Sequence, residues 1–117
     1  MFHTSQIQLS KSALKNNIDF LKQLIGPETR LSSVIKGNAY GHGIEEWIPV
    51  AEEAGVRHFA VFNAYEGLRA QRTLSEENCS LMIMGMIDEP ELEWAIENEV
   101  EFFVFEPQRV SDALAKA

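Results

Sequence analysis

Lys36 ends a short apolar run and is followed at once by a glycine-rich turn. The run is Leu31–Ile35, and the turn covers positions 37–43, three of which are glycine. Such a pattern places one amine at the rim of a core, facing a flexible loop. Partial burial disfavours the charged form of an amine, so a lysine in this setting suits the formation of a Schiff base with a carbonyl cofactor. A lone lysine at a strand end usually extends into solvent, so the surrounding residues decide the interpretation.

Apolar runs alternate with helical patterns along the chain, and four of the runs are nearly continuous. They predict strands at Leu31–Lys36, His58–Phe62, Ser80–Ile87 and Phe102–Phe105, with a further short strand at Ile7–Leu9. Continuous hydrophobicity is typical of strands that are buried on both faces, which favours a parallel sheet.

Apolar residues also recur at helical spacing before the first long strand and after each of the four. The predicted helices contain the segments Leu14–Ile25, Ile44–Ala51, Tyr65–Arg72, Leu92–Ile96 and Val110–Leu114. Pro49 fits only the first turn of a helix, so its helix is expected to begin after Ile44 or to kink. Asp88 and Glu91 form a capping-box pattern around Pro90, which predicts a helix start.

The resulting fold class is α/β, with a helix after each parallel strand. Four β/α units that repeat every ~20–25 residues would make half of a (β/α)8 TIM-type barrel, whose whole length is about 250 residues. An open, doubly wound sheet is the competing architecture and would be complete at about this length. The periodicity alone does not decide between them.

Composition excludes several classes of function. The net charge of −8 argues against a nucleic-acid partner, because phosphate backbones require a basic surface. Cys79 is the single cysteine and the three histidines lack metal-ligand spacing, so neither a disulfide nor a metal site is expected. No apolar run reaches membrane length, and the first residues have no leader pattern. We therefore expect a cytoplasmic chain without a membrane partner.

The residues around Lys36 resemble a known cofactor-attachment motif. Positions Val34–Gly43 read VIKGNAYGHG and are similar to the pyridoxal-phosphate attachment signature of the alanine racemases. The usual signature has alanine after the lysine, where this chain has Gly37. The resemblance extends to Ile7–Asn17 and to Phe59–Arg69, so it covers most of the chain, but only the lysine segment is specific.

This resemblance implies a pyridoxal 5'-phosphate-dependent isomerase, a homodimer that interconverts L- and D-alanine for cell wall precursors. It assigns Lys36 both the covalent attachment of the cofactor and acid/base catalysis at the substrate α-carbon. Tyr40 is expected to hydrogen-bond the cofactor phosphate. In the family, the second acid/base is a tyrosine from the C-terminal β domain of the partner subunit. Tyr65, the other tyrosine of this chain, lies early in a predicted helix and is not expected to act as that second acid/base.

The length of the chain qualifies these expectations. The later barrel strands and the β domain of the family have no counterpart in residues 1–117. The resemblance therefore implies the N-terminal half of the family's (β/α)8 barrel domain, and we expect no appreciable racemase activity from this part alone. Two alternatives stay open. One is a non-catalytic or oligomerising fragment of that fold, and the other is a racemase of the same fold that acts on another amino acid.

A few further polar residues lie near the predicted site. His42 is expected to shape the turn rather than to react. Asn63, Met84 and Glu106 fall near the ends of later predicted strands, where they could line the same mouth as Lys36. The glycines are expected to serve the backbone geometry of the turn, since no nucleotide-binding fingerprint is present.

Overall fold

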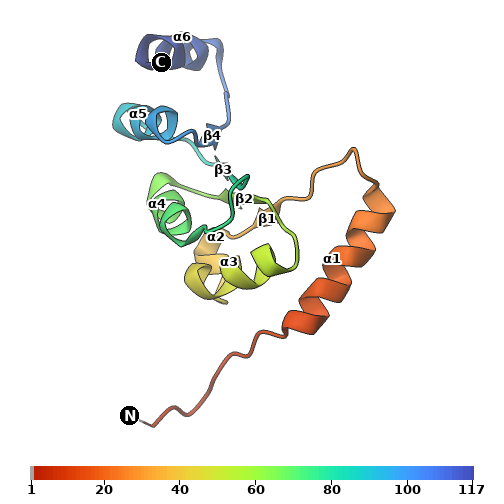
Figure 1. Cartoon of the computed structure of the whole chain (residues 1–117). Coiled ribbons are helices and arrows are strands. Elements are labelled where there is room, and N and C mark those ends of the chain that lie inside the picture. Colours follow the sequence, from red (N-terminus) through yellow and green to blue (C-terminus); the bar gives the residue numbers. More distant parts are fainter. Residues whose placement is uncertain (1) are drawn as a thin grey trace.

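The computed structural model describes residues 2–117, which form a four-stranded parallel sheet with helices packed along it (Figure 1). The strands are β1 (Ser33–Val34), β2 (His58–Val61), β3 (Ser80–Ile83) and β4 (Glu101–Phe102). The helices are α1 (Lys11–Ile25), α2 (Lys36–Tyr40), α3 (Ile44–Glu53), α4 (Ala64–Thr73), α5 (Glu89–Glu97) and α6 (Pro107–Lys116). The predicted alternation of parallel strands and helices is confirmed.

The order of the strands in the sheet decides between the two predicted architectures. The order is β1-β2-β3-β4, and every neighbouring pair is parallel. A doubly wound sheet reverses its strand order at a switch point, whereas a barrel adds each strand next to the one before. Helices α3, α4 and α5 follow one another around one side of the sheet (Figure 1). The chain therefore forms four consecutive β/α units of the barrel type.

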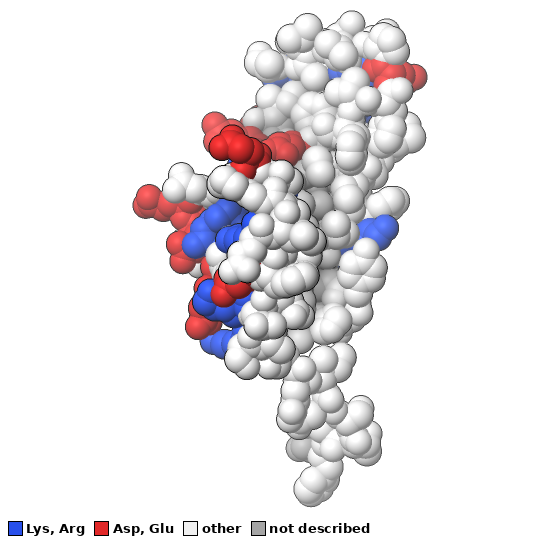
Figure 2. Space-filling model, turned by 90° about the vertical axis from the view of Figure 1, so that its right-hand side faces the viewer, with Lys and Arg blue, Asp and Glu red and all other residues white. Residues whose placement is uncertain are grey.

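The hydrophobic core lies between the sheet and these helices. Phe59 and Val61 of β2 are fully buried, and Ile35 and Leu92 belong to the same cluster. Val34 of β1 is 38% exposed, because four strands cannot close a barrel and the sheet face away from the helices stays open. Figure 2 views the side of the molecule that faces away from α4 and α5, where charged side chains gather mainly along one edge.

Several of the predicted strands are shorter than the apolar runs. Ile7–Leu9 is not a strand but part of an irregular N-terminal segment that projects from the molecule in Figure 1. A strand needs a hydrogen-bonded neighbour, and this segment has none among the described residues. β3 ends at Ile83 and β4 at Phe102, while β1 ends before Lys36, where the backbone enters a helical turn.

The predicted helix starts were only partly correct. α3 begins at Ile44 although Pro49 lies inside it, so the later start expected from the proline is wrong. Gly43 precedes this helix with a φ of 92°, a conformation that glycine adopts without strain, and it allows the chain to enter the helix directly. The capping box of α5 is confirmed, because Glu91 N donates to Asp88 Oδ1 at 3.0 Å and Asp88 N donates to Glu91 Oε2 at 2.9 Å.

A buried carboxylate ties α3 to the segment that precedes β3. Glu52 is 3% exposed and accepts hydrogen bonds from the backbone N–H groups of Ser75 at 3.0 Å and Glu76 at 3.1 Å. Burial by itself would raise the pKa of Glu52, but these hydrogen bonds outweigh it and the pKa is lowered. Burial, together with the hydrogen bond from Sγ to Glu52, raises the pKa of the Cys79 thiol to about 11. Glu52 therefore stays charged and Cys79 stays a thiol near neutral pH.

We expect Glu52→Gln to lower the free energy of unfolding by about 1–3 kcal/mol at neutral pH, because the amide cannot serve all the buried donors that the carboxylate serves. A carboxylate with a lowered folded pKa stabilises the fold above its unfolded pKa, near 4.3, and this contribution disappears as the pH falls through the folded value. Denaturant unfolding from about pH 3 to pH 7 should show that acid-sensitive contribution in the original chain and not in the variant.

Glu53→Gln is the matched control. The Glu53 carboxylate is exposed and pairs with Lys11 at 2.8 Å, so its loss is expected to change stability by less than about 1 kcal/mol. Equal effects of the two substitutions would contradict the assigned role of Glu52.

Candidate functional site

The backbone makes a left-handed helical turn directly after Lys36. Gly37, Asn38, Ala39 and Tyr40 have φ angles of 61°, 55°, 54° and 53°. A left-handed helix costs a non-glycine residue about 1–2 kcal/mol, and such conformations persist only where surrounding contacts enforce them, as happens often at ligand sites. Glycine in place of the usual alanine avoids this cost at the first of the four positions. A Cβ at Gly37 would meet no atom within 4 Å, so the position also has room for the alanine.

Side chains of α4 hold this turn in place. Glu66, 9% exposed, accepts a hydrogen bond from Asn38 N at 3.3 Å with one oxygen and from Phe62 N at 3.0 Å with the other. Arg69 donates to Asn38 Oδ1 at 2.8 Å, and the same oxygen accepts a bond from Ile44 N at 3.2 Å. We call Asn38, Glu66 and Arg69 the turn-fixing network. It joins the turn to the end of β2, to α4 and to the start of α3.

The Glu45 carboxylate pairs with the positive charge of Arg69 in this network. Arg69 Nε donates to Glu45 Oε1 at 2.8 Å, and Arg69 Nη2 donates to Oε2 at 2.6 Å. The hydrogen bonds from Arg69 lower the pKa of Glu45, and the same contact raises the pKa of Arg69. Both groups therefore stay charged, and the guanidinium stays oriented toward Asn38.

His42 shapes the far end of the turn, as the sequence predicted. Its Nδ1 lies 2.8 Å from the carbonyl oxygen of Ala39, which accepts the bond, and its ring centre lies 5.4 Å from the ring of Trp47. Trp47 in turn donates from Nε1 to Ser33 Oγ at 3.0 Å. The turn, α3 and β1 are thereby connected through side chains.

The Lys36 side chain is exposed at the start of the turn, so the expected partial burial is wrong for this chain. Among residues 2–117, the Lys36 amine has no ion pair or hydrogen bond, whereas each of the other four lysines has one. Those contacts are Lys11 with Glu53, Lys15 with Asp19, Lys22 with the Gly55 carbonyl and Lys116 with Glu93. Lys36 is therefore the one free lysine amine of the described chain.

Tyr40 ends the same turn and is 64% exposed, so both predicted cofactor residues lie on one helical turn. The three residues that were expected near Lys36 from the ends of later strands make no described contact with this turn. Asn63 is the N-cap of α4 and accepts a bond from Glu66 N at 2.9 Å, and Glu106 precedes α6 without a side-chain cap. None of the described contacts joins Asn63, Met84 or Glu106 to Lys36.

Comparison with known proteins settles the family. Residues 9–117 match the N-terminal domain of alanine racemase. This chain belongs to the alanine racemase family. The predicted resemblance to the alanine racemases and the first half of the barrel fold are thereby confirmed.

Individual relatives agree with this assignment. An alanine racemase from Leptospira interrogans is 31% identical over 102 residues, which cover 87% of this chain and 26% of that protein. A serine/alanine racemase from Enterococcus gallinarum is 40% identical over 65 residues, 56% of this chain and 9% of that protein. The crystal structure of alanine racemase from Bartonella henselae with covalently bound pyridoxal phosphate gives a TM-score of 0.69 at 28% identity, over 79% of this chain and 26% of that one. The chain thus spans about a quarter of the length of the alanine racemases it matches.

Glu66 and Arg69 are the parts of the candidate site that sequence reasoning missed. Asn63 followed by Glu66 three residues later is a capping-box pattern, and it does mark the start of α4. The Glu66 carboxylate, however, leaves the box and binds Asn38 N and Phe62 N instead. A local pattern predicts the helix start, but it contains no information about this contact across the fold.

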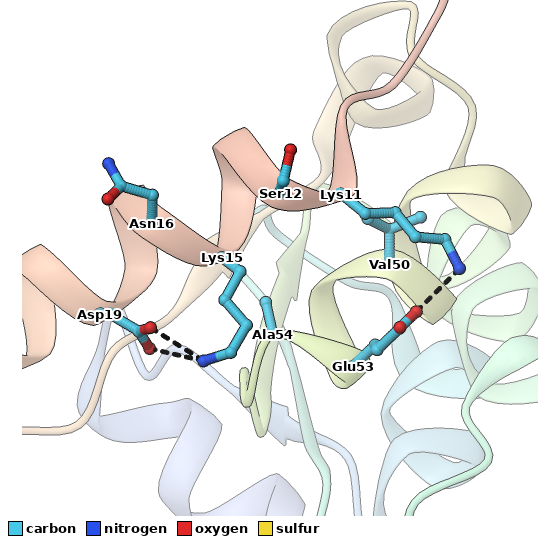
Figure 3. A pocket seen from close by; sticks show the side chains of 8 residues that line it. All are labelled: Lys11, Ser12, Lys15, Asn16, Asp19, Val50, Glu53 and Ala54. Atoms are coloured by element: carbon cyan, nitrogen blue, oxygen red, sulfur yellow. Dashed lines mark hydrogen bonds and ion pairs between the residues drawn. The ribbon is translucent and has the colours of Figure 1, made fainter.

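A groove with a volume of about 430 Å³ lies between α1 and α3, away from Lys36 (Figure 3). Its charged side chains are already paired, Lys11 with Glu53 and Lys15 with Asp19, each at 2.8 Å. None of its lining residues belongs to positions 36–43. The groove is therefore not part of the Lys36 site.

Residues 2–117 lack two further kinds of feature. No helix in this range combines the length and the apolar character that crossing a membrane requires. No group of three or more His, Cys, Asp and Glu side chains in the same range is placed to hold a metal ion.

Proposed function

We propose that residues 1–117 are the cofactor-bearing first half of the barrel domain of a pyridoxal 5'-phosphate-dependent racemase that acts on alanine. The proposal rests on Lys36, whose amine is exposed and unpaired at the carboxyl end of β1. Barrel active sites lie at this end of the strands. A Schiff-base lysine needs a free amine, and a neighbouring carboxylate would favour the charged form instead.

The residues present fit the cofactor. Lys36 would hold it covalently, and Tyr40 would donate a hydrogen bond to its phosphate from the other end of the same turn. The turn-fixing network supports the fit because it holds both residues on a strained but fixed backbone. When bound, pyridoxal phosphate supplies the electron sink that stabilises negative charge at the substrate α-carbon.

Lys36 would also move the α-proton. Its Nζ would accept or return that proton on its own face of the amino acid. Inversion requires a second acid/base on the opposite face. Tyr65 does not meet this requirement, because it is exposed on α4 and lines a groove with Leu68 and Trp94. The second group would come from outside this chain, from the partner subunit of a homodimer.

Reductive trapping tests the cofactor lysine directly. The purified chain is incubated with pyridoxal phosphate, reduced with borohydride and mapped by mass spectrometry. We expect the adduct at Lys36. Modification spread over Lys11, Lys15, Lys22 and Lys116 would contradict the proposal.

The serine/alanine racemase among the relatives favours a second candidate, a racemase with a wider choice of amino acid. The cofactor-loaded chain is incubated in D2O with L-alanine or L-serine, and deuterium at the α-carbon is measured. Because one proton-transfer face is present, we expect exchange with retained configuration and no racemisation. Faster exchange with serine would favour the second candidate. Racemisation by this chain would contradict the proposal that the second acid/base comes from outside it.

We expect Tyr40→Phe to weaken the binding of pyridoxal phosphate about 10- to 100-fold, because a hydrogen bond to a charged group contributes about 1.5–3 kcal/mol. Titration of the cofactor absorbance measures this affinity. Tyr65→Phe removes a hydroxyl from an exposed tyrosine of α4 and serves as the control. Equal affinities of the two variants would exclude the phosphate role of Tyr40.

A further inference from the structure

A second cluster of reactive side chains lies at the opposite end of the sheet from Lys36. His58, the first residue of β2, is 5% exposed. Its Nδ1 lies 2.7 Å from Ser32 Oγ, and its Nε2 lies 2.9 Å from Glu101 Oε2. Ser32 immediately precedes β1, and Glu101 begins β4. The side chain of His58 thus joins β2 to the residue before β1 and to the start of β4.

One tautomer of His58 satisfies both contacts. With its proton on Nε2, the neutral ring donates to the Glu101 carboxylate, and the Nδ1 lone pair accepts the hydroxyl proton of Ser32. A serine bonded to a histidine that a carboxylate orients is the arrangement of nucleophile and general base that recurs on unrelated folds. The bonding pattern therefore prepares Ser32 Oγ for attack on an electrophile.

The surroundings of the cluster suit such an attack. Ser32 is exposed and His58 is buried, so the nucleophile is accessible while the base is shielded. Arg30 donates to Ser80 Oγ at 3.2 Å and lies 3.6 Å from Glu101 Oε1, and Ser80 is the β3 partner of His58 in register. The guanidinium thus pairs with one oxygen of Glu101, while the other oxygen of the same carboxylate bonds His58.

We propose that Ser32, His58 and Glu101 form a second, nucleophilic site that cleaves small carboxylic esters. Ser32 Oγ bonds to the ester carbonyl carbon while His58 Nδ1 takes the hydroxyl proton. The bond to the leaving alcohol then breaks, and His58 returns the proton to that alcohol. Water attacks the acyl-serine in the same way, which releases the acid and restores Ser32. The site uses no cofactor and does not depend on the proposed racemase function.

A fluorophosphonate probe tests the nucleophile, with p-nitrophenyl acetate as the ester. We expect the probe on Ser32 by mass mapping, no label there in Ser32→Ala, and ester cleavage slowed about 100-fold or more in His58→Gln. Because His58 is buried, Glu101→Gln provides a second variant at a more exposed position, and it is expected to slow labelling at least about tenfold. Ser33→Ala is the matched control, since the neighbouring Ser33 Oγ instead accepts a bond from Trp47.

Two results would overturn the proposal. One is the absence of label on Ser32 in the folded chain. The other is labelling that Glu101→Gln leaves unchanged. A loss of thermal stability in the variants without any labelling of the original chain would show that the cluster only ties β1, β2 and β4 together.

Discussion

Replacing Lys36 with arginine is expected to abolish the covalent attachment of pyridoxal phosphate. Arginine keeps the length and the positive charge of the side chain, but its guanidinium does not lose its proton in proteins and cannot form the Schiff base. Lys36 is exposed and makes no described contact, so the substitution is expected to change the free energy of unfolding by no more than about 0.5 kcal/mol. The measurement is the yield of borohydride-trapped adduct, together with the thermal unfolding midpoint.

Lys15→Arg is the control for this experiment. Lys15 pairs with Asp19 at 2.8 Å on the surface of α1, and arginine can keep that ion pair. We expect its adduct yield to equal that of the original chain. An adduct that survives in Lys36→Arg would mean that another amine carries the cofactor, and the proposed function would fail with it.

The fold could be predicted largely from the sequence because its signals are local. His58–Phe62 is a continuous apolar run between helical patterns, and β2 occupies His58–Val61. The capping-box pattern of Asp88 and Glu91 predicted the start of α5, and its hydrogen bond joins residues only three positions apart. The choice between barrel and open sheet needed the strand order, which depends on pairing between distant segments such as β1 and β2. Local periodicity contains no information on that pairing.

The site was predicted only at its most specific residues. Lys36 and Tyr40 were identified from the string around them. Lys36 directly precedes the left-handed turn, and Tyr40 ends it. The exposure of Lys36 was not predicted, because it depends on how the other segments pack around the turn. Glu66 and Arg69 were missed for a similar reason, since their bonds to Asn38 join residues that are about thirty positions apart in the chain. Side-chain contacts of that range follow from the fold and not from a motif.

The strained turn is held by hydrogen bonds that do not involve the side chain of Lys36. β1 ends at Val34, and from Gly37 the backbone runs in a left-handed turn that cannot continue a strand. The strain of Asn38, Ala39 and Tyr40 is balanced by bonds to α4 and α3 rather than by any contact of Lys36 itself. The Lys36 amine takes part in none of these bonds, which leaves its nitrogen available for a ligand.

Glu66→Gln tests this arrangement at its most buried point. Both oxygens of Glu66 accept backbone N–H groups, so an amide can serve one of them and must turn its NH2 group toward the other. An unsatisfied buried donor costs about 1–3 kcal/mol, and we expect the free energy of unfolding to fall by that amount. Because a displacement of about 1 Å can cost a reaction about 100-fold, we also expect trapping at Lys36 to slow at least about tenfold. Denaturant unfolding and the time course of adduct formation measure the two effects.

Glu91→Gln separates this role from ordinary helix capping. Glu91 occupies the same third helical position in α5 that Glu66 occupies in α4, but it bonds its own N-cap residue Asp88. Glutamine serves equally well in a capping box, so we expect Glu91→Gln to change neither stability nor trapping. If Glu66→Gln lowered stability without slowing the reaction at Lys36 under conditions where the chain stays folded, Glu66 would stabilise α4 without positioning the lysine.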